Sequence, residues 1–148
     1  MNNQKSLEEK VAAYKLVARD ALRMELINPR LTNVADLEGN LKSANEKTTN
    51  LEFDVKVENY ELSKLDTEHP NFEKRKVRKE ETLKSLATSI EENKKFVTEI
   101  EKEIAEEKAA IAKIESGETK VSLENLNSLV DKLIRQDALN QVPNYSTS

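Results

Sequence analysis

The sequence predicts an all-α protein, in which a long antiparallel coiled-coil helical hairpin forms an arm and two shorter helices form a small head. Charged residues make up 35% of the chain, whereas 2 Gly, 3 Pro and 4% aromatic residues are too few for the turns and core of a sheet protein. The apolar residues recur at steps of three and four, which is the helical period. A length of 148 residues favours a single domain, residues 1–148.

A first helix is expected over residues 6–27. Ser6 and Glu9 have the spacing of a capping box, in which the two side chains satisfy free amides at a helix start. We expect the helix to stop before Pro29, because proline disfavours helical geometry in the residue that precedes it. The stripe between these limits consists of Leu7, Val11, Tyr14, Ala18, Leu22 and Leu26.

Two long helices are expected over residues 33–66 and 71–116, with a turn at Pro70 between them. Both carry apolar residues in an unbroken alternation of three and four, which is typical of a coiled-coil seam. Two such seams joined by a short connection favour an antiparallel hairpin. The second of these helices should end at Ser116, because Gly117 suits the left-handed position that follows many helices.

The two seams allow two registers. In an antiparallel pair, the residue numbers of facing positions add up to a constant, and a value of 141 places Thr48 opposite Asn93. A value of 134 instead pairs Glu58 with Lys76, but it buries the amide of Asn93 against an apolar side chain. An unsatisfied buried amide costs about 1 to 3 kcal/mol, which favours 141. The charges near the turn favour 134.

A shorter fourth helix is expected over residues 122–137, with Ser122 as its N-cap. Its apolar arc is wider than a two-helix seam requires, so it should pack in the head against more than one neighbour. Residues 138–148 offer little to bury, and we expect a flexible tail there.

An apolar stripe on the helix over residues 33–66 faces away from its predicted partner helix, and such a stripe usually meets another surface. We call Phe53, Val57 and Tyr60 the outward stripe. Packing within the chain or between copies of it is one interpretation, and a dedicated partner site is the other. Together with the apolar face of the fourth helix, the stripe forms the predicted partner-binding surface. Its residues are Phe53, Val57, Tyr60, Leu126, Val130 and Leu133.

Five positive charges occur within six residues at the start of the helix over 71–116. They form the basic tip, Lys74, Arg75, Lys76, Arg78 and Lys79. A helix spreads such charges around its surface, and Glu73 and Glu80 flank them. A solvated helix face is therefore the simpler interpretation, and contact with phosphates or an acidic protein is the alternative.

The residue types argue against catalysis, a metal site or a cofactor. The chain has no Cys and a single His, which removes thiolate nucleophiles and most metal sites built from these side chains. Gly39 and Gly117 stand alone, so no Gly-rich phosphate loop is present. A net charge of −4 argues against nucleic-acid binding by bulk charge.

The sequence contains neither an apolar run long enough for a membrane span nor the apolar core of a signal peptide. We therefore expect no membrane partner and a cytoplasmic location, which includes incorporation into a larger assembly such as a virion.

These features predict a non-enzymatic structural, assembly or adaptor protein that acts through coiled-coil protein–protein interaction and self-association into a homo-oligomer. The alternative is a regulator or inhibitor that binds a nucleic-acid-processing complex through the basic tip. Salt separates the two hypotheses, because binding through exposed charges weakens steeply as ionic strength rises and apolar association does not.

Overall fold

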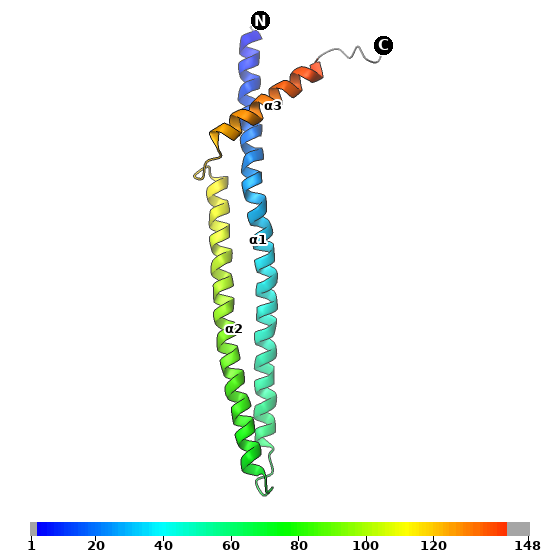
Figure 1. Cartoon of the computed structure of the whole chain (residues 1–148), viewed down its shortest axis with the longest axis vertical. Helices are drawn as coiled ribbons and strands as arrows, with labels where there is room; N and C mark the ends of the chain where they lie inside the picture. Colours follow the sequence, from blue (N-terminus) through cyan, green and yellow to red (C-terminus); the bar gives the residue numbers. More distant parts are fainter. Residues whose placement is uncertain (1–2, 142–148) are drawn as a thin grey trace, which may run out of the picture. The chain divides into compact units, whose positions relative to one another are not determined.

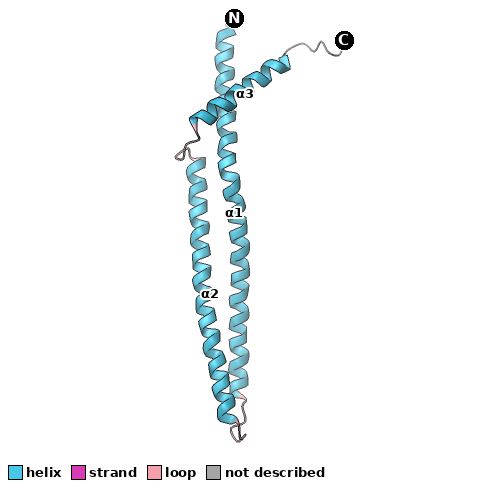
Figure 2. Cartoon of the chain, in the orientation of Figure 1, coloured by secondary structure: helices cyan, strands magenta, loops and turns pink. Residues whose placement is uncertain are grey.

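The structure is a computed structural model that describes residues 3–141 as three helices and their connections (Figure 1). Helix α1 spans Asn3–Ser63, α2 spans Phe72–Glu115 and α3 spans Leu123–Gln141. Figure 2 shows helices and loops over these residues and no strand. The predicted all-α class is therefore confirmed.

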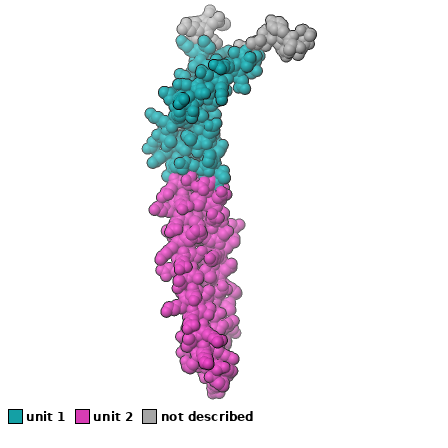
Figure 3. Space-filling model, in the orientation of Figure 1, with its two compact units in different colours: residues 1–32, 108–148 teal, residues 33–107 magenta. Residues whose placement is uncertain are grey.

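The chain forms two compact units (Figure 3). We call residues 33–107 the arm unit, and residues 1–32 together with 108–148 the head unit. The arm unit contains the second part of α1 and most of α2, whereas the head unit contains the first part of α1, the end of α2 and α3. The arm unit is therefore one continuous segment, whereas the head unit combines two segments that are far apart in the sequence.

Helix α1 continues through Pro29, so the predicted separation into helices over 6–27 and 33–66 is wrong. A proline in a helix interior removes one backbone N–H and crowds the preceding turn, at a cost of about 3 kcal/mol. Pro29 and Glu25 are both exposed, so water can reach the Glu25 carbonyl that loses its partner. Ile27 and Val34, on either side of the proline, are only 4% and 7% exposed. The burial of these side chains offsets the cost of the proline.

The end of α2 lies within one residue of its predicted position. Gly117 follows with a φ of 81°, which confirms the expected left-handed position. The Thr119 N–H then donates to the Lys113 carbonyl at 2.9 Å, which satisfies an acceptor in the last turn of the helix.

Helix α3 has the predicted cap and a later end than predicted. The Asn125 N–H donates to Ser122 Oγ at 3.3 Å, so Ser122 acts as the N-cap. The helix runs to Gln141, so the predicted end at 137 is wrong and residues 138–141 are helical. Residues 142–148 of the predicted tail lie outside the described residues.

Within the arm unit, α1 and α2 run side by side in opposite directions and pack closely (Figure 1). Their core contains Ala44 from α1 with Ile100 and Ile104 from α2, all at most 9% exposed. Leu37, Leu41 and Val97 pack against these residues and are half-buried.

Asn93 is the polar residue that is buried among the described side chains, at 7% exposure. Its Nδ2 donates to the Ala44 carbonyl at 2.7 Å and to Thr48 Oγ1 at 2.6 Å. Thr48 Oγ1 in turn donates to the Ala44 carbonyl at 3.2 Å. The facing pair is therefore the one that the constant of 141 predicts, and the amide is satisfied.

In the connection between α1 and α2, two side chains accept hydrogen bonds from backbone N–H groups two residues further along the chain. Asp66 Oδ1 accepts from the Glu68 N–H at 3.0 Å, and His69 Nδ1 accepts from the Asn71 N–H at 3.0 Å. The Phe72 N–H donates to the His69 carbonyl at 3.0 Å. The single His is thus a turn residue, as its position beside Pro70 indicates.

In the head unit, α3 crosses α1 (Figure 1). Ala18 and Leu22 from α1 contact Leu126 and Val130 from α3, and all four are at most 9% exposed. Five further apolar residues are partly buried around them, namely Tyr14, Val121, Leu129, Leu133 and Ile134.

The cost of Pro29 can be measured directly. Replacing Pro29 with Ala restores the missing N–H on an exposed face, and we expect the free energy of unfolding to rise by up to about 3 kcal/mol. Gly39→Ala is the matched control, because a Cβ at Gly39 would meet nothing within 4 Å. It should raise stability by only about 0.5 to 1 kcal/mol. Urea unfolding followed by circular dichroism measures both, and a Pro29→Ala variant of lower stability would contradict the description of α1.

The Thr48 and Asn93 pair calls for a double-mutant cycle. Thr48→Val leaves Asn93 one partner short, and we expect a loss of about 1 kcal/mol in the free energy of unfolding. The double variant Thr48→Val with Asn93→Leu replaces both polar groups, so it should recover much of the loss that each single variant shows. Losses that simply add up in urea unfolding would show that the two residues are not coupled.

Candidate functional site

The outward stripe lies on the part of α1 that belongs to the arm unit. Phe53 and Tyr60 are 62% and 65% exposed, and Val57 is half-buried. Lys64 Nζ lies 5.6 Å from the centre of the Tyr60 ring, which is within the range of a cation–π contact. Because most of their surface is exposed, the rings of Phe53 and Tyr60 can be reached by another protein.

The predicted partner residues of the fourth helix are placed differently. Leu126 and Val130 are each 6% exposed against α1, and Leu133 is partly buried beside them. They belong to the head unit, whereas the outward stripe belongs to the arm unit. Contacts with α1 cover most of their surface, so they are core residues in this structure. The exposed apolar side chains of α3 are Leu123 and Leu139, at 69% and 71% exposure.

A second apolar row on α1, in the head unit, escaped the sequence analysis. Val17, Met24 and Leu31 follow one another at intervals of seven, and they are 55%, 47% and 47% exposed. Leu16 beside them is 61% exposed. The seven-residue interval was the available signal, but the predicted break at Pro29 divided the row.

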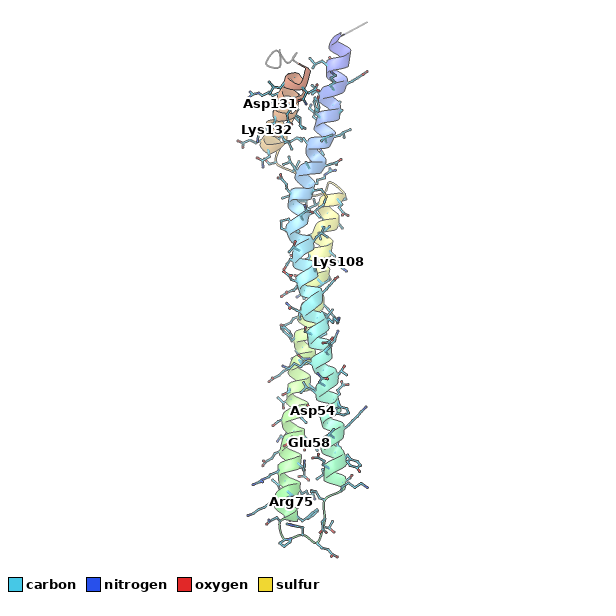
Figure 4. The ribbon with its side chains drawn as sticks, turned by 90° about the vertical axis from the view of Figure 1, so that its right-hand side faces the viewer. Asp54, Glu58, Arg75, Lys108, Asp131 and Lys132 are labelled. Atoms are coloured by element: carbon cyan, nitrogen blue, oxygen red, sulfur yellow. The ribbon has the colours of Figure 1, made fainter. Side chains whose placement is uncertain are left out.

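The basic tip is partly neutralised by carboxylates of the same chain. Lys79 Nζ lies 3.1 Å from Glu58 Oε2 and also contacts Glu61. Figure 4 shows Glu58 between α1 and α2, with Arg75 closer to the connection. Glu58 Oε2 is buried, so the Lys79 ammonium is its stabilising neighbour. Lys76 Nζ lies 4.0 Å from Glu80 Oε1.

The other cations of the basic tip, Lys74, Arg75 and Arg78, are exposed. Arg75, Arg78 and Lys79 line a cavity of about 300 Å³, which Glu58 also lines. The tip therefore offers three cations to solvent, close to the half-buried carboxylate of Glu58.

Tyr14 links α1 and α3 through Asp137. A hydrogen bond to Asp137, together with burial and the negative charge of that carboxylate, raises the pKa of Tyr14. Lys10 Nζ lies 3.9 Å from Asp137 Oδ2 in the same place. These contacts hold the C-terminal half of α3 against α1, which is a structural role.

Within residues 3–141, no three His, Asp or Glu side chains come together in a group that could hold a metal ion. None of the three described helices combines the length and apolar character that a membrane crossing requires. Comparison with protein-family models, curated proteins and solved structures finds no match to this chain.

The Lys79 contacts predict a pH dependence. Hydrogen bonds to Glu61 and Glu58 raise the pKa of Lys79 above the ordinary lysine value. Because the folded-state pKa is the higher one, the stabilisation is complete below the ordinary lysine pKa and is lost as pH rises through the raised pKa. Lys79→Gln should therefore lower the melting temperature at neutral pH, and the difference from the natural chain should shrink at strongly alkaline pH.

Lys94→Gln is the control for this prediction. Lys94 Nζ lies 3.9 Å from Glu52 Oε1, and these side chains are 64% and 53% exposed, so little stability depends on the pair. Equal decreases in melting temperature for Lys79→Gln and Lys94→Gln would contradict a special role for Lys79.

Proposed function

We propose that this chain is a non-enzymatic structural, assembly or adaptor protein, which associates with copies of itself and with partner proteins through coiled-coil contacts. The observation that supports this most is the exposure of Phe53 and Tyr60 on the outward stripe. Large aromatic side chains on a helix surface are frequent anchors of protein interfaces. The proposal places the protein in the cytosol, alone or inside a larger assembly such as a virion.

The packing in the arm unit supports the coiled-coil part of the proposal. An antiparallel hairpin with a heptad seam accounts for the contact of Ala44 with Ile100 and for the facing of Thr48 and Asn93. Such a seam leaves the opposite side of α1 open. A further helix, from a second copy or a partner, would bury the outward stripe.

The basic tip supports the second candidate function, binding to a nucleic-acid-processing complex, through the exposed cations Lys74, Arg75 and Arg78. Two of the five positive charges of the basic tip already lie close to carboxylates of this chain, and this weakens their attraction for an external anion. We therefore favour binding through the outward stripe over binding through the basic tip.

The stripe can be tested with a double substitution. Phe53→Ser with Tyr60→Ser should leave the helical circular dichroism signal intact, because both side chains are mostly exposed. It should weaken self-association by about 2 kcal/mol or more, because buried aromatic anchors carry much of the energy of an interface. Sedimentation equilibrium at several protein concentrations measures the association.

Leu51→Ser with Val55→Ser is the matched control on the same helix. Both side chains are half-buried, and the proposed seam places them toward α2, so this variant should lose thermal stability first. If the Phe53 and Tyr60 variant unfolds instead, the stripe is part of the chain's own core. If it changes neither stability nor association, at low or high salt, the proposal is wrong.

A further inference from the structure

A second surface, in the head unit, combines positive charge with apolar side chains. It is a groove of about 450 Å³ between α1, the connection after α2 and the start of α3. Three cations line it, Arg19, Arg23 and Lys120. Its apolar wall consists of Val121, Leu123 and Leu126. We call it the basic groove, and its described lining includes no carboxylate.

The charges of the basic groove are poorly compensated within the chain. Arg23 Nη1 lies 4.0 Å from Asp20 Oδ1, whose side chain is 77% exposed and therefore well solvated. Arg19 and Lys120 have no carboxylate oxygen within 4.0 Å among the described residues. Three positive charges thus converge in a chain whose net charge is −4. An anion in the groove would relieve their mutual repulsion.

The Arg23 side chain lies against the connection after α2. It is only 29% exposed. Its Nη2 lies 3.1 Å from the point where a Cβ on residue 117 would be. Residue 117 also has a φ of 81°, which glycine adopts without strain. The absence of a side chain at Gly117 therefore leaves the space that the guanidinium occupies. An arginine that is already partly enclosed before binding loses less conformational entropy when an anion arrives.

We propose that the basic groove binds a short acidic segment of a partner protein, with carboxylates on the three cations and an apolar side chain against Leu123. A small molecule fits less well, because Leu123 is 69% exposed and Lys120 is exposed, so the groove would leave much of a small ligand in water. A nucleic acid fits less well, because no aromatic side chain lines the groove for base stacking. The groove shares no residue with the outward stripe, so the two proposals fail independently.

The test uses the full chain and a fluorescein-labelled peptide of eight residues that contains four glutamates and two leucines. Fluorescence anisotropy at low salt measures its binding. Arg19→Glu with Lys120→Glu should weaken binding about tenfold or more, because the variant replaces attraction with repulsion at the site. Lys74→Glu with Arg75→Glu, which makes the same change of charge outside the groove, should change binding less than about twofold.

Folding is checked by circular dichroism, and Arg19→Gln with Lys120→Gln replaces the charge-reversal variant if that variant unfolds. A peptide with glutamines in place of glutamates should bind weakly. No binding of the acidic peptide up to millimolar concentration, or equal loss in the groove and tip variants, would overturn the proposal. Tighter binding of a thymidine oligonucleotide that depends on Arg19 and Lys120 would also overturn it, in favour of a nucleic-acid site.

Carbodiimide crosslinking gives a second readout that does not depend on affinity. The reagent joins a carboxylate of the peptide to a lysine amine that it contacts, and mass spectrometry identifies the lysine. We expect the peptide on Lys120 more often than on Lys74 or Lys76. Crosslinks at the basic tip without one at Lys120 would refute the assignment.

Discussion

The amide of Asn93 fixes how the two helices of the arm unit pack against each other. It donates to the Ala44 carbonyl and to Thr48 Oγ1, both from α1, at a site where its own exposure is only 7%. The apolar positions around it are similar from one heptad to the next, so they alone would allow a shift by seven residues. Such a shift would remove both partners of the amide at a cost of about 1 to 3 kcal/mol. The other pairings in the arm unit, including that of Lys79 with Glu58, follow from this register.

The packing of α1 is incomplete in both units. No large described side chain is less than 2% exposed, so each large apolar residue keeps some contact with water. Each additional square ångström of apolar surface that is buried contributes about 25 cal/mol. The large apolar side chains of α1 with the highest exposed fractions are Leu7, Leu16 and Val17 in the head unit, and Phe53 and Tyr60 in the arm unit. Covering these side chains with another surface would lower the free energy of the chain further.

The sequence predicted the helical class, the ends of α2 and the facing of Thr48 and Asn93, because these depend on periodicity and on single polar residues. It missed the continuity of α1, because local rules for proline say nothing of how much burial Ile27 and Val34 regain. It assigned Leu126 and Val130 to a partner-binding surface, whereas α1 covers them, because a wide apolar arc does not reveal which neighbour covers it. The basic groove was also beyond the sequence, since Arg19, Arg23 and Lys120 come from segments about one hundred residues apart.

The architecture of the arm unit also bears on whether its side chains are better arranged for protein recognition or for catalysis. General acid–base and nucleophilic catalysis depend on groups that converge in a water-excluded site, where electrostatic interactions are strong. The arm unit is built from parts of two helices, α1 and α2. Its most enclosed polar group is the Asn93 side chain, whose amide nitrogen already donates to Ala44 and Thr48. Among the ion pairs of the arm unit, Lys94 and Glu52 are 3.9 Å apart and more than half exposed, whereas Lys79 and Glu58 are 3.1 Å apart and neutralise each other. Two packed helices thus present extended surfaces that carry both apolar and charged side chains, and this supports the proposed recognition of other proteins.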